Sequence, residues 1–177
     1  MNRIYLLIAI LFTAISPKLY SQEIADTKDI KALASNKFDT AYKVIGIKDG
    51  DTFVVLKDLT PLTIRFTHID CPEKAQPYGN KAKQFLSTLI FGKYITIAPN
   101  FSYDRNKRLL AEVYLNDSIC VNKEMIKNGY AWHFLKYSNN QEYSNLEKEA
   151  RAQKLGLWSL PQPIAPWDWR KGIRGIQ

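Results

Sequence analysis

Three carboxylates and an arginine lie close together in the sequence of a strongly basic chain. Arg65, Asp70 and Glu73 fall within one short segment, TIRFTHIDCPE. Asp51 lies upstream, in the acidic turn DGDT. The whole chain has 25 Lys and Arg residues against 17 Asp and Glu residues, so a local excess of acidic groups needs an explanation. These groups form either a chemical site or a set of turn residues and structural ion pairs.

Asp51 and Asp70 are candidate ligands for a metal ion. Asp51 opens one strand-like run and Asp70 closes the next, so the two carboxylates meet only if the sheet is strongly curled. Two neighbouring carboxylates repel each other unless a cation or a proton lies between them. Oxygen ligands without sulfur or imidazole suit a hard ion such as Ca²⁺ or Mg²⁺. The alternative is that both aspartates, together with Asp49, are ordinary turn residues.

Arg65 needs an anionic partner. It alternates with Ile64 and Phe66 in a run that predicts a central strand, and its guanidinium cannot lose its charge there. The partner is either a carboxylate of the same group or the phosphate of a ligand. Arg108, which follows the segment DRNK, is a second arginine at the start of a strand-like run.

Together these residue types predict the hydrolysis of a phosphodiester. Arg65 and Arg108 would neutralise the phosphoryl oxygens, which bidentate guanidinium groups do better than point charges. A cation held by Asp51 and Asp70 would bind a further oxygen and position a water molecule. Glu73, just past the cation site, would orient or deprotonate that water.

Five strand-like runs and three helical segments must position these residues. The runs are AYKVIGI, TFVVL, LTIRFTH, KYITIAP and RLLAEVYL, with turns at Asp49-Gly50 and KDLTP between the first three. Apolar residues at helical spacing predict a helix in YGNKAKQFLSTLIFG. Further helices are expected over 121–128 and over about 139–156, the second with a capping box of Asn139 and Glu142. This order predicts an α+β fold, namely a five-stranded OB-type β-barrel with three α-helices.

The amino-terminal segment MNRIYLLIAILFTAISPKLYSQ predicts a secretory signal peptide over residues 1–21. It has an early arginine, an apolar run and a polar exit, and an uncleaved anchor is the alternative. Its removal takes away Arg3 and Lys18 and no acidic residue, so the net charge falls from +8 to +6. That excess favours a polyanionic partner, which is nucleic acid, anionic lipid or acidic polysaccharide.

The cysteines and histidines do not predict a zinc site. Cys71 and Cys120 are the two cysteines, either free or paired with each other, and they form no CxxC motif. His68 and His133 are isolated, which argues against structural zinc and favours structural roles for both rings. The alternating aromatic residues of YAWHFLKY could stack on bases, but at least two are expected to pack the helices onto the barrel.

Five segments, taken in order and spacing, resemble the staphylococcal nuclease family. They are DGDT, IRFTHIDCPE, YGNKA, DRNKR and EARAQKLGLWS, and the resemblance covers about residues 42–159. It implies an OB barrel with three helices. It also implies Ca²⁺-dependent hydrolysis of DNA and RNA that leaves 3′-phosphate ends.

By position, the resemblance implies roles for particular residues. Asp51 and Asp70 match the calcium ligands, and Cys71 stands where a threonine contributes its backbone carbonyl. Glu73 matches the carboxylate proposed as general base. The positions that meet the substrate are the two catalytic arginines, Arg65 and Arg108, and the further contacts Arg105, Lys107 and Tyr137.

The chain departs from the family pattern near the substrate. Asn106 and Lys107 replace a Tyr-Gly pair before the second arginine, and Leu135 replaces a tyrosine that binds a terminal phosphate or stacks on a base. Tyr137 fits the companion position of that tyrosine. Substrate affinity and the balance between end-cutting and internal cutting depend on these positions.

The sequence therefore predicts an exported, Ca²⁺-dependent nuclease that acts on DNA and RNA as a monomer, without stable membrane association once the signal peptide is removed. One alternative is a catalytically inactive OB module that binds nucleic acid. Another is an exported binder of acidic polysaccharide or anionic membrane, which gives no reason for the carboxylates to gather beside Arg65.

The tail is expected to be extended and packed by its tryptophans, with Arg170, Lys171 and Arg174 as a solvated basic end. The expected parts are a signal peptide (1–21), a polar leader (22–38), a nuclease-like OB domain (39–160) and a Pro/Trp-rich tail (161–177).

Overall fold

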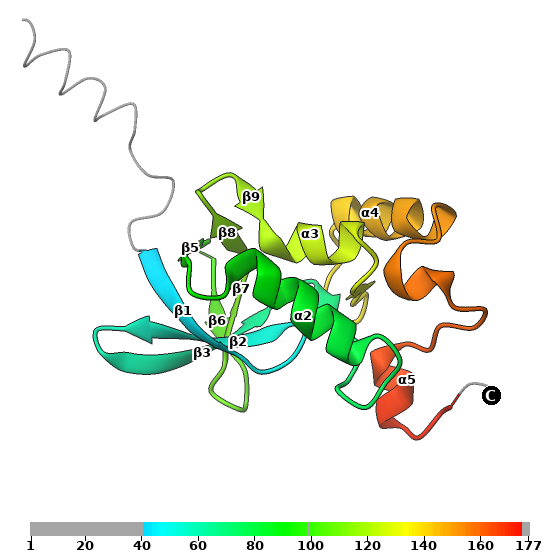
Figure 1. The fold of residues 1–177 in the computed structure, drawn as a ribbon, viewed down its shortest axis with the longest axis horizontal. Helices are drawn as coiled ribbons and strands as arrows, with labels where there is room; N and C mark the ends of the chain where they lie inside the picture. Colours follow the sequence, from blue (N-terminus) through cyan, green and yellow to red (C-terminus); the bar gives the residue numbers. More distant parts are fainter. Residues whose placement is uncertain (1–40, 99, 175–177) are drawn as a thin grey trace, which may run out of the picture. The chain divides into compact units, whose positions relative to one another are not determined.

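The computed structural model describes residues 41–98 and 100–174 (Figure 1). The predicted signal peptide (1–21) and polar leader (22–38) lie outside these residues. Within the described ranges, no helix is long and apolar enough to cross a membrane.

In the described part of the chain, ten strands form two sheets. Their bounds are β1 Ala41–Ile47, β2 Thr52–Lys57, β3 Thr60–Phe66, β4 Ile69–Asp70, β5 Tyr94–Ile97, β6 Ser102–Tyr103, β7 Leu109–Ala111, β8 Val113–Leu115, β9 Ile119–Cys120 and β10 Trp132–His133. Eight strands pair in the order β6-β7-β3-β2-β1-β5-β8-β9, and β4 pairs with β10 separately. The pairs are antiparallel except that of β3 with β7, which is parallel.

The meander of β1, β2 and β3 brings the acidic turn beside the arginine. The turn predicted at Asp49-Gly50 joins β1 to β2. Asp58 and Leu59 join β2 to β3 with φ of 46° and 67°, the left-handed backbone that a tight two-residue hairpin requires. The register sets Thr52 opposite Arg65, so the turn that precedes Thr52 lies at the same end of the meander as the guanidinium.

Four α-helices lie within the described residues. The helices predicted first and second are confirmed as α2 (Gly79–Ile90) and α3 (Val121–Lys127). The third, α4 (Gln141–Ala152), begins two residues later and ends four residues earlier than the predicted span of about 139–156. Its N-cap is Asn140 rather than Asn139, since the side chain of Asn140 accepts the hydrogen bond from the Glu142 amide at 3.0 Å.

The tail contains a helix where an extended chain was expected. A 3₁₀ turn, η1 (Gly156–Ser159), is followed by α5 (Pro166–Arg170). Proline suits the first turn of a helix, since its fixed φ is helical and its missing N–H would have no partner there. The prediction that the tryptophans of the tail pack inward is correct for Trp167, which contacts Trp132.

The main core lies between the sheet and two helices. Phe53, Ile64, Leu86 and Met125 are among its fully buried side chains, and they come from β2, β3, α2 and α3. Burial of one such side chain contributes about 1.5–3 kcal/mol. Figure 1 shows α2 lying across the sheet, where it packs against β1 and α3.

A second apolar cluster anchors the carboxyl-terminal part of the chain. It is formed by Trp132, Ala150, Leu157, Trp158 and Ala165, from β10, α4, η1 and the residue before α5. The cluster fixes the start of α5 next to β10, which is itself paired with β4.

The predicted α+β class is confirmed, but its finer description is not. Among residues 41–98 and 100–174, the strands of the main sheet pair in an open series of eight, and four α-helices replace the expected three. Two local features contribute to the difference, besides the short added strands β6 and β9. The run RLLAEVYL is divided at Glu112 into β7 and β8, and the tail forms α5.

Asn122 of α3 stabilises the break between β7 and β8. Its side chain accepts a hydrogen bond from the amide of Val113 at 3.0 Å and donates to the carbonyls of Ala111 and Thr67, both at 3.1 Å. The residue is fully buried. The chain can therefore leave one strand pairing and enter another without orphaned backbone groups.

Asn122→Ala should lower the free energy of unfolding by about 3 kcal/mol, because it removes the side-chain partner of the Val113 amide and of the Thr67 carbonyl, and one of two partners of the Ala111 carbonyl. Chemical denaturation of the purified chain measures this loss. Asn145→Ala is the matched control. The exposed side chain of Asn145 accepts a hydrogen bond from Gln141, one helical turn away, and its removal should cost at most about 0.5 kcal/mol. Equal losses in the two variants would contradict this account of the break.

Candidate active site

Asp51 lies in a turn that has no room to move. A side chain on Gly50 would bring its Cβ within 2.8 Å of the Cβ atoms of Ala82 and Cys71, so the turn packs directly on α2 and on the residue after β4. The amide of Asp51 donates to the carboxylate of Asp49 at 3.1 Å. Packing and hydrogen bonding together hold the Asp51 carboxylate toward the end of β3.

One guanidinium joins the two predicted metal ligands. Arg65 Nη1 donates to Asp51 Oδ1 at 2.6 Å, and Nη2 donates to Asp70 Oδ1 at 2.7 Å. The second oxygen of Asp51 accepts the amide of Cys71 at 3.0 Å. Asp51 and Asp70 are 2% and 1% exposed. The ends of β2, β3 and β4 therefore meet, as the metal-site prediction required.

Burial dominates the electrostatics of this pair. It raises the pKa of Asp51 to about 6, even though the charge of Arg65 favours the ionised form. It also raises the pKa of Asp70, against the hydrogen bond from Arg170. Burial acts to lower the pKa of Arg65, but attraction to the two aspartates outweighs it and raises that pKa. A further positive charge beside Asp51 and Asp70 would therefore stabilise their ionised forms.

The donor set fits a hard cation. Asp51 and Asp70 offer carboxylate oxygens in a buried position, with no imidazole or thiolate among the paired groups. Among the described residues, no group of three or more His, Cys, Asp or Glu side chains is placed to hold a metal ion. The two aspartates would thus supply two side-chain ligands. The other ligands would be backbone carbonyl, water or substrate oxygens.

Glu73 lies on a loop that is tightly fixed at its backbone. Its amide donates to Gln76 Oε1 at 3.0 Å, and its carbonyl accepts the amide of Gln76 at 2.8 Å. A Cβ on Gly79 would fall 1.9 Å from that carbonyl, so the loop needs glycine at the start of α2. The Glu73 side chain itself is exposed enough to reach solvent.

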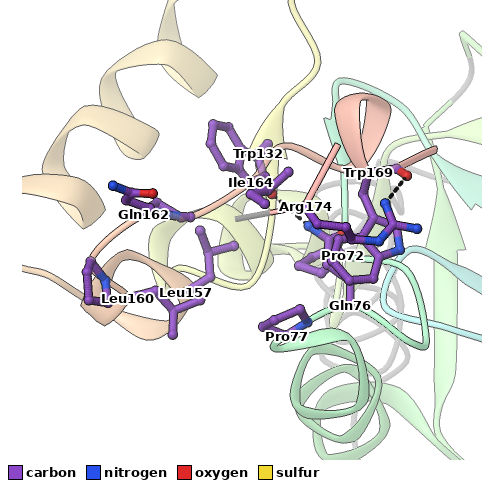
Figure 2. Close-up of a pocket in the computed structure, with 12 residues that line it drawn as sticks. Pro72, Gln76, Pro77, Trp132, Leu157, Leu160, Gln162, Ile164, Trp169 and Arg174 are labelled. Carbon is purple, nitrogen blue, oxygen red and sulfur yellow. Dashed lines mark hydrogen bonds between the residues drawn. The ribbon is translucent and has the colours of Figure 1, made fainter. Parts of the chain in front are cut away.

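The side chain of Gln76 also ties this loop to the tail. Its Nε2 donates to the carbonyl of Ile164 at 2.6 Å (Figure 2). Gln76 also lines a cavity of about 480 Å³. Figure 2 shows other side chains that line it, among them Pro72 and Pro77 from the loop and Trp169 from α5. The carboxylates described above are not among the residues that line it, so the cavity is separate from the acidic site.

Arg170 reaches the same carboxylates from α5. Its Nη2 donates to Asp70 Oδ2 at 2.6 Å, and its Nη1 donates to Glu73 Oε1 at 2.7 Å. The prediction of a solvated basic end is therefore wrong for this residue. Its only signal in the sequence was its place after Pro and two Trp residues in PWDWRKG, a pattern that packs a short helix.

Arg108 is paired with a carboxylate of its own loop, Asp104. It precedes β7, which runs parallel to β3 and sets Leu110 beside Arg65. Its guanidinium binds Asp104, with Nε and Nη2 each 2.7 Å from Oδ2. Partial burial acts to raise the pKa of Asp104, but hydrogen bonds from the amide and the guanidinium of Arg108 outweigh it and lower that pKa. Arg65 thus lies on β3, while Arg108 lies just before the neighbouring strand β7 and has a different partner.

The other predicted substrate contacts are exposed. Arg105 and Lys107 lie on the loop before Arg108. Tyr137 is exposed and packs edge-on against Phe134 at 4.9 Å between ring centroids. Phe134 in turn stacks flat on Trp167 of α5 at 5.3 Å.

The histidines and cysteines have structural surroundings. His68 Nδ1 and His133 Nε2 each lie 2.8 Å from the hydroxyl of Ser138, and burial lowers the pKa of both rings. Cys71 and Cys120 are free and buried, which resolves the alternative left open by the sequence. Packing of the YAWHFLKY aromatics is confirmed for Trp132, which lies in the second apolar cluster.

Comparison with known proteins identifies the class. The family model described as "Staphylococcal nuclease homologue" matches residues 63–160. An Escherichia coli O157:H7 protein named "Uncharacterized endonuclease" is 39% identical over 128 residues, which cover 72% of this chain and 83% of that protein. A Haemophilus influenzae protein of the same name is 38% identical over 130 residues, covering 73% and 72%. A rice protein named "Probable staphylococcal-like nuclease CAN2" is 34% identical over 157 residues, covering 89% and 41%.

An α+β fold with these matches defines a hydrolase of the nuclease class, as predicted. The chain belongs to the staphylococcal nuclease family, because the family model covers more than half of it. The resemblance inferred from its five segments is confirmed.

Gly50→Ala should lower the free energy of unfolding by about 1–3 kcal/mol, because its new methyl group overlaps Ala82 and Cys71. Gly46→Ala is the matched control, since a Cβ there meets nothing closer than Val54 at 3.9 Å. Urea denaturation of both variants measures the difference. A Gly50 variant as stable as the Gly46 variant would show that the turn is not held by packing.

Proposed function

We propose that this protein is an exported, Ca²⁺-dependent nuclease that hydrolyses phosphodiester bonds of DNA and RNA and leaves 3′-phosphate ends. The observation that carries the proposal is the buried pair of Asp51 and Asp70 on the guanidinium of Arg65. A structural ion pair needs one carboxylate for one arginine. The second buried carboxylate, Asp70, is paired with Arg170 in this structure, and a bound cation would take over that balancing charge. The names of the relatives, endonuclease and staphylococcal-like nuclease, support the same reaction.

Asp51, Asp70 and the backbone carbonyl of Cys71 would hold the Ca²⁺. When bound, the ion would withdraw charge from a phosphate oxygen and order a water molecule. The rigid turn at Gly50 and the hydrogen bond from the Cys71 amide keep Asp51 in place for this role.

Arg65 and Arg108 would stabilise the charge that develops on the phosphoryl group. Arg65 uses two of its five N–H donors on the aspartates, so the others remain for phosphate oxygens. Its orientation is set before the substrate binds, which makes its charge more effective. Arg108 would exchange Asp104 for the phosphate, a change that is confined to one loop.

Glu73 would orient or deprotonate the attacking water. Its fixed backbone and exposed carboxylate place an acceptor at the edge of the site, where water has access. Arg105 and Lys107 would contact neighbouring phosphates, while the exposed ring of Tyr137 offers a surface for stacking on a base.

The scaffold is proposed to be an OB-type barrel over residues 39–160, with 161–177 as a separate tail and with residues 1–21 as the export signal of a monomer. Support for the barrel comes from β7 and β8. They lie one residue apart, yet β7 pairs with β3 and β8 pairs with β5, at opposite ends of the β3-β2-β1-β5 series. Barrel closure requires one nearly continuous segment, here β7 and β8, to pair with both end strands of the series.

The purified chain should cleave plasmid DNA and total RNA with Ca²⁺ and should not cleave them with a chelator. Arg108→Ala should lower turnover about 10²- to 10³-fold, as the loss of one preorganised donor does in other enzymes. Cleavage of a fluorogenic oligonucleotide measures turnover. The 3′-phosphate is detected by the need for a phosphatase before a polymerase can extend the products.

Lys57→Ala is the control for Arg108→Ala, because it removes one exposed positive charge at the far end of β2. It should leave turnover unchanged. Near-normal turnover in Arg108→Ala would contradict the proposed mechanism. Salt-sensitive binding without cleavage by the unmodified chain would instead identify a catalytically inactive nucleic-acid-binding module.

A further inference from the structure

The carboxyl-terminal helix α5 is built into the acidic site. Trp167 stacks on Phe134 and meets Trp132 edge-on at 5.7 Å, so the helix is fastened to β10 and the residue that follows it. The Gln76–Ile164 hydrogen bond fastens the segment before α5 to the loop of Glu73. The position of Arg170, at the last turn of this helix, is therefore set by packing on both sides.

Arg170 occupies the carboxylate atoms that a cation would need. Asp70 is almost fully buried, and both of its oxygens already accept hydrogen bonds. Oδ2 accepts Arg170 Nη2 at 2.6 Å, while Oδ1 accepts Arg65 Nη2 at 2.7 Å and lies 3.4 Å from Arg170 Nη1. The same Nη1 of Arg170 donates a hydrogen bond to Glu73 Oε1 at 2.7 Å. One guanidinium thus bridges the predicted metal ligand and the predicted base.

The Asp70 carboxylate cannot bind both the Arg170 guanidinium and a divalent cation strongly at the same time. A guanidinium and a divalent cation bound to the same buried carboxylate repel each other, and low exposure weakens the screening by solvent. Arg65 has Asp51 as a second partner and can remain. Arg170 is 42% exposed and can move into solvent, so it is the group that has to leave.

We infer that Arg170 is a further residue of this site that sets its affinity for the cation, because its guanidinium holds Asp70 and Glu73 in the cation-free protein and leaves them when Ca²⁺ binds. This inference rests on the proposed function. The inference extends the proposed function, since the departure of Arg170 also frees the Glu73 carboxylate to bind water. Cation binding and release of the base are then one event, and α5 is a positioning element of the enzyme.

Calorimetric titration of the purified full chain with CaCl₂ alone tests the competition. Arg170→Ala should bind Ca²⁺ about tenfold more tightly than the unmodified chain, which corresponds to about 1.4 kcal/mol. Arg170→Lys should fall between the two, because a point charge cannot bridge both carboxylates as a planar fork does. This conservative variant also keeps the test open if Arg170→Ala folds poorly.

Lys171→Ala is the matched control. It removes the same charge from the next residue, but Lys171 is 68% exposed and contacts Asp168 rather than the site. Its Ca²⁺ affinity should stay within twofold of that of the unmodified chain, because exposed charges are strongly screened. A gain in Arg170→Ala without a gain in Lys171→Ala separates direct competition from a general change of charge.

Thermal unfolding gives a second readout that a purely structural role would not produce. In chelator, Arg170→Ala should melt at a lower temperature than the unmodified chain, because Asp70 and Glu73 lose their partner. In saturating CaCl₂ this gap should shrink, since by linkage the contact contributes only to the cation-free state.

Two results would overturn the inference, and they differ in what they mean for the proposed function. Ca²⁺ binding to Arg170→Ala with unchanged or weaker affinity would leave the cation site standing and make Arg170 a structural residue. No Ca²⁺ binding by the unmodified chain or by any of the variants would overturn the cation site itself, and with it the competition.

Discussion

The structure of the site depends on one guanidinium. Arg65 holds Asp51 and Asp70 at 2.6 and 2.7 Å, and these contacts join a turn, a central strand and a short strand that follows it. Burial of three charged groups is expensive unless each is paired and hydrogen-bonded. The tight turn at Gly50, the amide of Cys71 and the register of β2 with β3 all serve this requirement. Without Arg65 the two carboxylates would repel each other.

The second apolar cluster extends this arrangement to the carboxyl-terminal part of the chain. Trp132 lies on β10, opposite Asp70 on β4, and contacts Trp158 and Trp167. The same cluster therefore supports the backbone of a predicted metal ligand and the helix that carries Arg170. The tail was predicted to be extended with a solvated basic end, but its helix α5 is a structural part of the site.

The sequence predicted the features that depend on local patterns of residues. The Asp49-Gly50 turn, the helical spacing of α2 and the buried strand around Arg65 follow from short-range rules, and the meeting of Asp51 with Asp70 followed from the chemistry they share. Contacts across long stretches of chain were missed. Arg170 binds a residue 100 positions away, and no periodicity encodes that distance. The division of the fifth strand depends on Asn122 of α3, whose side chain binds the Ala111 carbonyl and the Val113 amide on either side of Glu112. The Arg108–Asp104 pair spans one loop and could have been predicted from their spacing.

The central claim is that one planar guanidinium must bridge both aspartates and still face the phosphate. Steady-state cleavage of DNA in saturating Ca²⁺ by Arg65→Lys tests it most directly, because lysine keeps the charge but cannot form two parallel bridges. The account predicts that turnover falls at least about 100-fold while the chain remains folded by circular dichroism. Turnover close to that of the unmodified chain would contradict it, since a point charge at this position would then be enough.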